Sequence, residues 1–320
     1  MRRYLVVGGA GFIGSHFVDR LIADGEYVRI FDDFSSGRDW HFAHHEGKEN
    51  FAVTMGNAES IRQLAIAMTG IDTVIHLASN ADIAAAALDP TIDFYKGTLL
   101  TQCVLEAMRR SQVGQLIYAS GSGVYGDAGE RELTEWSALN PTSPYGASKL
   151  AGESLIHCYA EMFGLRACIF RFANVVGARQ THGVVYDFLR KLRDNPTRLQ
   201  VLGNGQQSKS YIHVSDVINA VMVAQRTAVL ANFGMPVRIY NVGTGDYVTV
   251  QDIAHVCASY AAPNAVIEFG ESPRGWAGDV PIVRLNTDKI RAHGWVPTFK
   301  TRDAIRISIN ELRNDMAEHG

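Results

Sequence analysis

Hydrophobic positions in the first half of the chain alternate between two patterns. Short continuous apolar runs are typical of strands buried on both faces, and longer segments with apolar residues at helical spacing lie between them. The expected strands are Tyr4–Val7, Val28–Phe31, Thr73–Leu77, Gln115–Ser120 and Ala167–Phe172, and the expected helices are Phe12–Ala23, Ile61–Met68, Thr91–Arg109 and Tyr145–Phe163. This alternation predicts an α/β fold, a Rossmann-like doubly wound parallel sheet with helices on both faces.

The pattern becomes irregular beyond about residue 172. Glycine, asparagine and glutamine separate short apolar runs there, while Val214–Arg226 favours a helix and Arg238–Val242 a strand. We therefore expect two domains. The sheet domain comprises 1–172 plus roughly 211–245, and a smaller α/β domain comprises 173–210 and 246–320.

Composition and charge exclude several classes of protein. The 320 residues are 47% hydrophobic and 20% charged with a net charge of -3, which is ordinary for a globular protein and offers no field to attract nucleic acid or an acidic membrane. Neither a membrane-spanning run nor a signal-peptide core is present, and the four cysteines form no CxxC pair. We expect a soluble, cytoplasmic protein with reduced thiols and without nucleic-acid or membrane partners.

A glycine-rich run directly follows the first expected strand and opens the first helix. It reads Gly8-Gly9-Ala10-Gly11-Phe12-Ile13-Gly14. In such a run Gly8 permits a tight turn, Gly11 lets the backbone approach a pyrophosphate, and Gly14 lets the helix pack closely on the strand. The free N–H groups of the helix N-terminus favour an anion. The run predicts a dinucleotide-binding loop.

Two carboxylates, Asp32 and Asp33, end the second expected strand. A carboxylate at this position hydrogen-bonds the adenosine ribose hydroxyls and repels the additional phosphate of NADP. The predicted cofactor is therefore NAD.

Tyr145 and Lys149 lie one helical turn apart at the start of a helix that follows Pro141 and Pro144. A nearby ammonium favours the phenolate and lowers the tyrosine's pKa toward a value useful for proton transfer. A Tyr-x-x-x-Lys spacing without other motifs is more often a Tyr/Lys pair on a solvent-exposed helix face than a catalytic pair. Here the dinucleotide loop and the polar strand end Ser120-Gly121-Ser122-Gly123 favour the catalytic interpretation.

Together these motifs resemble the extended short-chain dehydrogenase/reductase superfamily, and within it the NAD-dependent epimerase/dehydratase family, with the closest likeness to UDP-glucose 4-epimerase-like proteins. The resemblance extends over nearly the whole chain. Beyond the motifs above it rests on His76-Leu77-Ala78, Val124-Tyr125-Gly126-Asp127, Arg171-Phe172-Ala173-Asn174, Gly203–Asp216, Asn241-Val242-Gly243 and Arg274–Pro281.

The resemblance implies an isomerase that inverts C4 of a UDP-sugar through a transient 4-keto intermediate. Tyr145 is then the acid/base, and Lys149 lowers its pKa and holds the nicotinamide ribose. The candidate sugars are UDP-glucose or UDP-galactose, UDP-N-acetylglucosamine and UDP-glucuronate. Another nucleotide-sugar oxidoreductase or 2-epimerase of the same fold is an alternative, and a non-catalytic NAD-binding protein is a third. By analogy, a homodimer forms through the helices near Thr91–Arg109 and Tyr145–Phe163.

The resemblance also implies binding residues. Besides Tyr145 and Lys149, those for NAD are Gly8, Gly11, Phe12, Ile13, Gly14, Asp32, Asp33, Ser36, Gly37, Asn57, Ala58, Leu77, Ala78 and Ser120. Those for the substrate are Asn174, Gly183, Val184, Val201, Gln207, Lys209, Arg274 and Asp279. The cations among them, Lys209 and Arg274, suit a diphosphate.

The chain departs from the family pattern beside the tyrosine. The usual assisting serine or threonine is replaced by Gly121, so Ser122, Ser120 or a water is expected to serve instead. The Asp-Glu pair of the family's dehydratases is replaced by Ser122 and Gly123, which argues against elimination. The family's decarboxylases also carry a Glu at the position of Gly123, and its absence here argues against decarboxylation.

Three histidines close together in sequence, His41, His44 and His45, have metal-ligand chemistry. No carboxylate or cysteine stands at ligand spacing from them, so we expect a solvated loop and no metal.

Overall fold

The computed structural model describes residues 1–80, 82, 86, 88–230 and 235–319. The chain forms two compact units. The first unit comprises Met1–Gly121, Ala147–Arg171 and Ala224–Tyr240, and the second comprises Ser122–Gly146, Phe172–Val223 and Asn241–Gly320. Residues 122–146, 172, 211–223 and 241–245, which we assigned to the sheet domain from the sequence, fall in the second unit. For 211–213 the reason is pairing, because this strand hydrogen-bonds to a strand of the second unit.

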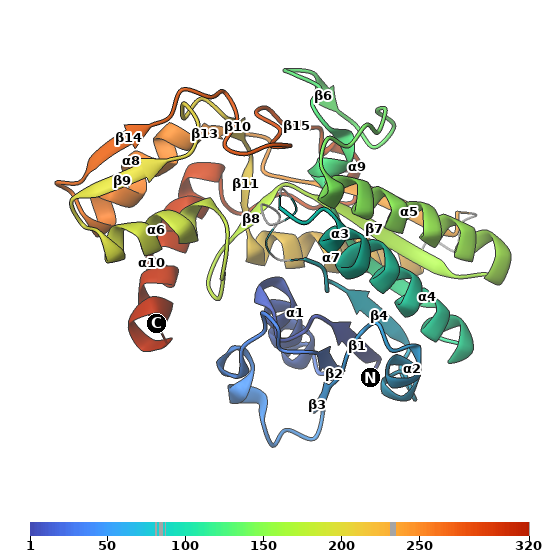
Figure 1. The fold of residues 1–320 in the computed structure, drawn as a ribbon. Coiled ribbons are helices and arrows are strands. Elements are labelled where there is room, and N and C mark those ends of the chain that lie inside the picture. Colours follow the sequence, from blue (N-terminus) through green and yellow to red (C-terminus); the bar gives the residue numbers. More distant parts are fainter. Residues whose placement is uncertain (81, 83–85, 87, 231–234, 320) are drawn as a thin grey trace. The chain divides into compact units, whose positions relative to one another are not determined.

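A seven-stranded sheet forms the centre of the first unit (Figure 1). Its order is β12-β7-β5-β4-β1-β2-β3, and the strands from β5 to β3 pair in parallel. The strands are β1 (Arg3–Val7), β2 (Tyr27–Asp32), β3 (Phe51–Met55), β4 (Thr73–His76), β5 (Gln115–Gly121), β7 (Arg166–Phe172) and β12 (Val237–Val242). The predicted α/β class is confirmed. The sequence did not reveal β3, which is a half-exposed edge strand without a continuous apolar run.

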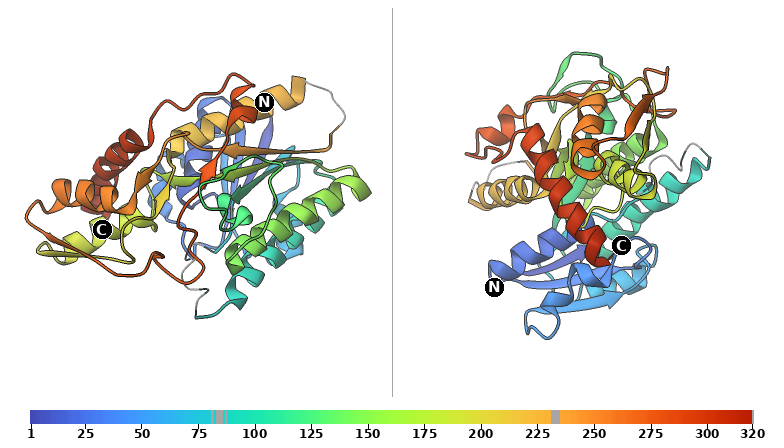
Figure 2. Two further views of the ribbon diagram at one scale, coloured as in Figure 1. Left: turned by 90° about the horizontal axis from the view of Figure 1, so that it is seen from above. Right: turned by 90° about the vertical axis from the view of Figure 1, so that its left-hand side faces the viewer.

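The helices of this unit follow the predicted periodicity. They are α1 (Phe12–Ala23), α2 (Ile61–Ala67), α3 (Thr91–Asp93), α4 (Leu100–Arg110) and α5 (Pro144–Phe163), with short 3-10 turns η1 (Asp39–His41) and η2 (Ala43–His45). A π-helical turn, η4 (Phe94–Leu99), divides the single helix expected over Thr91–Arg109. Helices α4 and α5 lie side by side (Figures 1 and 2), and Gln102 donates a 2.8 Å hydrogen bond to the Tyr159 hydroxyl between them.

The strand order reverses at β1, which lies between β4 and β2. Loops at the carboxyl ends of strands on either side of such a reversal diverge, and ligands bind there. The β1 and β4 ends are tied together, since the N–H groups of Leu77 and Ala78 both donate to the Val7 carbonyl, at 2.9 and 3.0 Å. Leu5, Val7 and Val74 on these strands are fully buried in the core below the ends.

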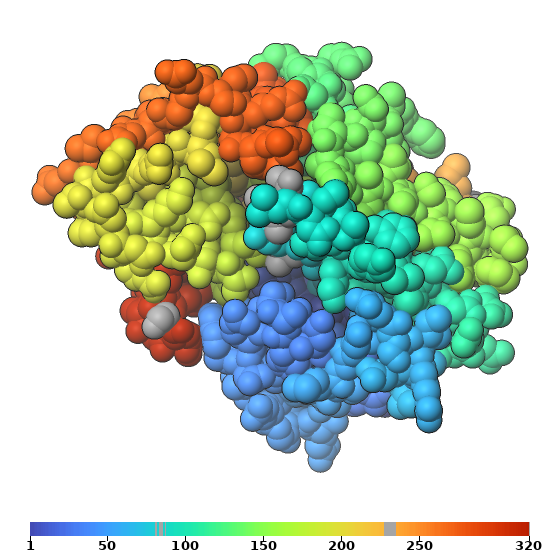
Figure 3. All heavy atoms as spheres, viewed as in Figure 1, coloured from blue at the N-terminus to red at the C-terminus, as the bar shows by residue number. Residues whose placement is uncertain are grey.

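The second unit consists of short paired strands packed with helices. Its described strands form three parallel pairs, β11–β8, β14–β9 and β15–β6, and one antiparallel pair, β10–β13. The atoms of β9 and β14 adjoin on the surface in Figure 3. The strands are β6 (Glu132–Leu133), β8 (Asn174–Val176), β9 (Arg198–Val201), β10 (Ser208–Lys209), β11 (Tyr211–His213), β13 (Val248–Thr249), β14 (Val266–Phe269) and β15 (Arg284–Leu285).

The helical segments of this unit include a short turn, η5, at the end of β5. They are η5 (Ser122–Tyr125), α6 (Val184–Asp194), α8 (Val250–Ala261), α9 (Asp288–Arg291) and α10 (Thr301–His319), and α7 (Val214–Leu230) begins here. One apolar core joins α6, α8 and α10 through residues such as Phe188, Ile253 and Ile309. Within the described part of the chain, no helix is both long and apolar enough to cross a membrane.

Candidate active site

The loop after β1 has the geometry of an anion cradle. Gly8 has a φ of +84°, which disfavours any side chain, and a Cβ on Gly14 would lie 2.1 Å from the Gly8 carbonyl oxygen. Gly11 is the N-cap of α1, and the first turn of α1 contains no acidic residue. The N–H groups at this helix N-terminus therefore keep their capacity to bind an anion such as a pyrophosphate.

Asp32 at the end of β2 braces this loop. Its Oδ2 accepts from the Ala10 N–H at 2.9 Å and its Oδ1 from the Phe34 N–H at 2.9 Å. Burial raises the pKa of the Asp32 carboxyl, and these hydrogen bonds oppose that rise. Asp33 is exposed and accepts from Ser35. Of the two, Asp32 thus has a structural role in the loop, and ribose binding by either stays a prediction.

The other expected cofactor positions lie at the same sheet edge or beside it. Leu77 and Ala78 follow β4, and a Cβ on Gly8 would lie 2.7 Å from the Ala78 nitrogen. Asn57 follows β3, and its Oδ1 accepts from the Glu59 N–H, so its carbonyl is engaged within the chain. The structure thus gathers loops from β1, β2, β3 and β4 at one edge. These positions fit a dinucleotide laid across the strand ends.

Helix α5 carries Tyr145 in its first turn and Lys149 one turn later. Lys149 is 4% exposed, and its Nζ donates to the Ala119 carbonyl at 2.9 Å. Burial lowers the pKa of Lys149 to about 8, against the opposing effect of Asp93 and Glu153. The ammonium is thus held in a fixed place, one turn from Tyr145. With a pKa of about 8, Lys149 begins to lose its proton just above neutral pH.

Two carboxylates near Lys149 were not predicted from the sequence. Glu153 is 2% exposed, and it accepts from the Ser120 hydroxyl at 2.6 Å and from Arg171 at 2.6 and 3.0 Å. Asp93 is 1% exposed. One of its oxygens accepts from Asn80 at 2.9 Å, and the other has no hydrogen-bond partner among the described residues. Helical spacing offered a signal for Glu153, since it follows Lys149 by four residues.

The turn η5 packs directly against the start of α5. A Cβ on Gly146 would lie 2.5 Å from the Gly123 carbonyl oxygen, so the two backbones touch. Ser122 opens η5 and is half-buried. The segment with the replaced serine position therefore lies beside the turn that carries Tyr145.

In the second unit, the fold brings Lys209, Arg274 and Asp279 together. Lys209 Nζ lies 2.6 Å from Asp279 Oδ1, and Arg274 Nη1 donates to the Asp279 carbonyl at 2.9 Å. Arg274 Nη2 also pairs with Asp127 at 2.9 Å. The residues predicted for diphosphate and ribose thus form one cluster, although they are far apart in sequence.

Gln207 is 2% exposed, and both its amide atoms lack a hydrogen-bond partner among the described residues. A Cβ on Gly203 would lie 2.2 Å from its Nε2. A buried amide without partners is costly in a native protein and often marks a place where a ligand supplies the missing hydrogen bonds. Gln207 was predicted to grip the nucleotide, and its unsatisfied amide fits that role.

The remaining predicted substrate residues are spread over three elements. Asn174 opens β8 opposite Tyr211, and Gly183, with a φ of +100°, caps α6 just before Val184. Val201 ends β9, where its side chain is 2% exposed and belongs to the core. Because the Val201 side chain is in the core, a substrate would contact Val201 through its backbone.

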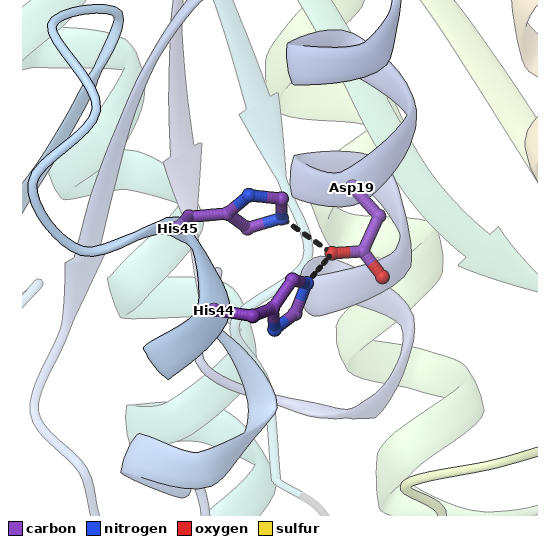
Figure 4. Close-up of side chains that lie close together, drawn as sticks. All are labelled: Asp19, His44 and His45. Carbon is purple, nitrogen blue, oxygen red and sulfur yellow. Dashed lines mark hydrogen bonds and ion pairs between the residues drawn. The ribbon is translucent and has the colours of Figure 1, made fainter.

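The histidine cluster differs from the expectation. His44 and His45 both lie on η2, and their Nε2 atoms are 2.8 and 2.6 Å from the same oxygen of Asp19 on α1 (Figure 4). The inference that these histidines have no carboxylate partner is therefore wrong, because the fold supplies one from 25 residues away. His41 is separate and buried, with its Nδ1 2.7 Å from the Ala10 carbonyl oxygen.

Comparison with known proteins identifies the family. The sequence model of the NAD dependent epimerase/dehydratase family matches residues 4–243. The chain belongs to this family. Its cofactor is NAD, and the cradle at the β1 and β4 ends fits that cofactor.

Individual relatives cover almost the full length. The UDP-glucose 4-epimerase of Mycolicibacterium smegmatis is 31% identical over 98% of this chain and 99% of its own. A crystal structure of a UDP-galactose 4-epimerase has a TM-score of 0.87 at 34% identity, covering 98% of this chain and 99% of that one. The UDP-glucose 4-epimerase of Thermus thermophilus, solved in complex with NAD, has a TM-score of 0.84 at 30% identity, covering 97% and 99%.

Other similar proteins catalyse different reactions. UDP-glucuronic acid decarboxylase 1 of Danio rerio is 28% identical over 99% of this chain and 74% of its own. A dTDP-glucose 4,6-dehydratase from Streptomyces venezuelae has a TM-score of 0.88 at 25% identity, covering 99% and 98%. Similarity therefore establishes the enzyme family, and the choice of reaction rests on the residues of the site.

Proposed function

We propose that this enzyme is a UDP-sugar 4-epimerase. The observation that carries the proposal is an intact Tyr145/Lys149 pair on α5, combined with Ser122 and Gly123 at the positions where the family's dehydratases and decarboxylases carry carboxylates. Such a site has a group for moving one proton to and from a hydroxyl. It lacks, at those positions, the second acid and base that elimination requires.

In the proposed reaction Tyr145 takes the proton of the sugar 4-hydroxyl and later returns it. The Lys149 ammonium stabilises the Tyr145 phenolate, which is the form that accepts this proton and is restored when the proton returns to the sugar. NAD, when bound, would supply the hydride acceptor and donor for the sugar C4. Return to the opposite face of a 4-keto sugar inverts C4 without net oxidation, so the products are the epimer and unchanged cofactor.

The nucleotide would be held by the second unit. Lys209 and Arg274 are the cations for the diphosphate, and each now pairs with an aspartate that an incoming phosphate must displace. The unpartnered amide of Gln207 would gain hydrogen bonds from the nucleotide. Asn174 would contact the substrate. Val283, at a position often occupied by a bulkier residue near the sugar, favours a pocket that tolerates an N-acetyl group.

The hydroxyl beside Tyr145 is the least usual part of this site. We propose that Ser122 replaces the missing serine or threonine at Gly121, since η5 packs on the turn of Tyr145. Ser120 is the weaker candidate because its hydroxyl donates to Glu153. Ser122→Ala should lower kcat by about 10²-fold or more with little change in KM. An unchanged kcat would mean that a water or Ser120 serves, or that Tyr145 acts alone.

The test of the function is incubation with UDP-glucose, UDP-N-acetylglucosamine and UDP-glucuronate, followed by NMR. Inversion at C4 of at least one of them is expected, with Tyr145→Phe as the inactive control. Absorbance of reduced nicotinamide should not accumulate during turnover. Steady accumulation would identify a net oxidoreductase, inversion at C2 a 2-epimerase, and no reaction with any of the three would contradict the proposal.

We further propose that the enzyme is a cytoplasmic homodimer formed through α4 and α5. Exposed apolar residues on and beside these helices support the proposal, since Phe163 is 49% and Tyr95 51% exposed. Analytical ultracentrifugation should give twice the chain mass of 35.1 kDa. A single species at the chain mass would contradict it.

A further inference from the structure

A compact group of potential metal ligands lies on the first unit and contains none of the residues assigned to NAD. Asp19 comes from the middle of α1, and His44 and His45 come from η2 (Figure 4). The three ligand atoms, two imidazole Nε2 and one carboxylate oxygen, all lie within 4.8 Å of one another. The side chain of His44 is 48% exposed and that of Asp19 31%, so the group is open to solvent on one side.

The ligand types and separations fit a small borderline-soft cation. Imidazole nitrogen and carboxylate oxygen are common zinc ligands at about 2.0–2.2 Å, so neighbouring ligands around a tetrahedral ion are separated by roughly 3.4 Å. The two nitrogen–oxygen separations here are 2.8 and 2.6 Å. Widening each by less than about 1 Å places an ion between three ligands, and water can take the fourth position.

We propose that Asp19, His44 and His45 form a binding site for Zn²⁺ or a chemically similar divalent transition metal. This site is independent of the proposed epimerase function. Its position gives it a structural consequence: α1 begins at the phosphate loop, and the segment from Asp33 to Lys48 follows Asp32 at the end of β2.

That segment is already bound to the phosphate loop at its near end. The Arg38 N–H donates to the Ala10 carbonyl at 3.1 Å, and His41 Nδ1 contacts the same oxygen at 2.7 Å. A metal at Asp19, His44 and His45 would fasten the far end of the segment to α1. Metal binding should therefore stabilise the first unit against unfolding, because the ion binds the folded arrangement preferentially.

Lys48 provides a substitution expected to strengthen binding. Its Nζ lies 2.8 Å from His45 Nδ1, and its side chain is exposed. With a metal on Nε2, the proton of a neutral His45 moves to Nδ1, where it meets the ammonium. Lys48 must then swing away, so Lys48→Met should bind the metal more tightly than the wild-type chain.

The experiment is calorimetric titration of the metal-free, full-length protein with Zn²⁺, repeated with Mg²⁺. One equivalent of Zn²⁺ should bind and raise Tm, and Mg²⁺, which prefers oxygen ligands, should not. His44→Ala and Asp19→Asn should each weaken Zn²⁺ binding by at least about tenfold. The matched control is His157→Ala, which removes an exposed histidine elsewhere in the same unit and should leave binding unchanged.

A second readout is the visible spectrum of the Co²⁺-loaded protein, in which a four-coordinate site absorbs far more strongly than hydrated cobalt. Absence of stoichiometric Zn²⁺ binding would overturn the proposal. Binding that persists in both His44→Ala and Asp19→Asn would overturn it as well. Should either variant fold poorly, tighter binding by Lys48→Met still supports the site, and equal or weaker binding contradicts it.

Discussion

At the scale of single residues, the most consequential feature is the burial of the Lys149 charge. An ammonium removed from water loses hydration, which accounts for the fall in its pKa to about 8. One hydrogen bond to the Ala119 carbonyl and two nearby carboxylates only partly compensate. Burying Lys149 therefore lowers the free energy of unfolding of the protein, and it also fixes a positive charge one turn from Tyr145.

This burial gives stability a specific pH dependence. The folded pKa of Lys149 is about 8 and the ordinary value is 10.5. Between these values the unfolded chain holds a proton that the folded protein has released, so the contribution of Lys149 to the free energy of unfolding rises with pH. Wild-type stability minus that of Lys149→Met should rise by on the order of 3 kcal/mol from pH 7 to pH 10.5.

Urea unfolding at a series of pH values measures this difference. Tyr145→Phe is introduced into both proteins, because the Tyr145 phenol titrates in this range and lies one turn from Lys149. Titrating groups remote from Lys149 are common to both proteins and cancel. Lys300→Met, which removes an exposed lysine, is the matched control and should give a curve parallel to the wild type. Parallel curves for Lys149→Met as well would show that Lys149 keeps an ordinary pKa.

At the scale of elements, α5 places three side chains of the proposed site at intervals of four residues, Tyr145, Lys149 and Glu153. Glu153 links the helix to two strands, since it accepts from Ser120 on β5 and from Arg171 on β7. The pair with Arg171 is almost fully buried, with side chains 3% and 2% exposed. Glu153 thus fixes the position of the helix that carries Tyr145, the proposed acid/base.

Glu153→Gln should destabilise the protein by about 3–5 kcal/mol, because it removes the carboxylate that pairs with the buried Arg171 charge. Glu161→Gln on the same helix is exposed and should change the free energy of unfolding by less than about 0.5 kcal/mol. Denaturant unfolding compares the two. Equal stabilities would show that the buried pair contributes nothing.

The junction of β1 and α1 depends on a missing side chain at Gly14. A Cβ there would lie 2.1 Å from a backbone oxygen, so Gly14→Ala must separate the helix from the loop. NAD affinity should fall by at least about tenfold as the N–H groups lose their alignment. Gly114→Ala meets nothing within 4 Å and is the control. Calorimetric NAD titration of both variants tests this, and equal affinities would contradict it.

At the scale of the whole molecule, the residues predicted to bind NAD, other than Tyr145, belong to the first unit, and the residues predicted to bind the substrate belong to the second. Each ligand should therefore have its own effect on stability. A ligand at about 100 times its Kd adds about 2.7 kcal/mol to the free energy of unfolding. Gln207 distinguishes the two ligands, because its buried, unpartnered amide belongs to the second unit.

Gln207→Leu should stabilise the ligand-free protein by about 1–3 kcal/mol, because it removes an unsatisfied buried amide. It should abolish most of the stabilisation by UDP and leave that by NAD intact. The exposed neighbour Gln206→Leu is the control. Thermal unfolding with each ligand measures all three effects. If UDP stabilises Gln207→Leu as much as the wild type, Gln207 does not bind the nucleotide.

The sequence by itself determined the features that depend on neighbours along the chain. Continuous apolar runs and period-3.6 patterns reflect the burial of a single element, so β1, α1 and α5 were predicted within one or two residues. The phosphate loop and the spacing of Tyr145 and Lys149 are equally local. The family follows from such motifs taken in order.

The tertiary structure alone decided which distant side chains meet. The sequence around Glu153 does not predict its ion pair with Arg171, and the sequence around His44 does not predict its contact with Asp19. Both pairs form only when separate elements pack together. The edge strand β3 and the division into units depend on pairing between strands, which no local pattern encodes. Local periodicity specifies each element, whereas long-range contacts depend on how all the elements pack at once.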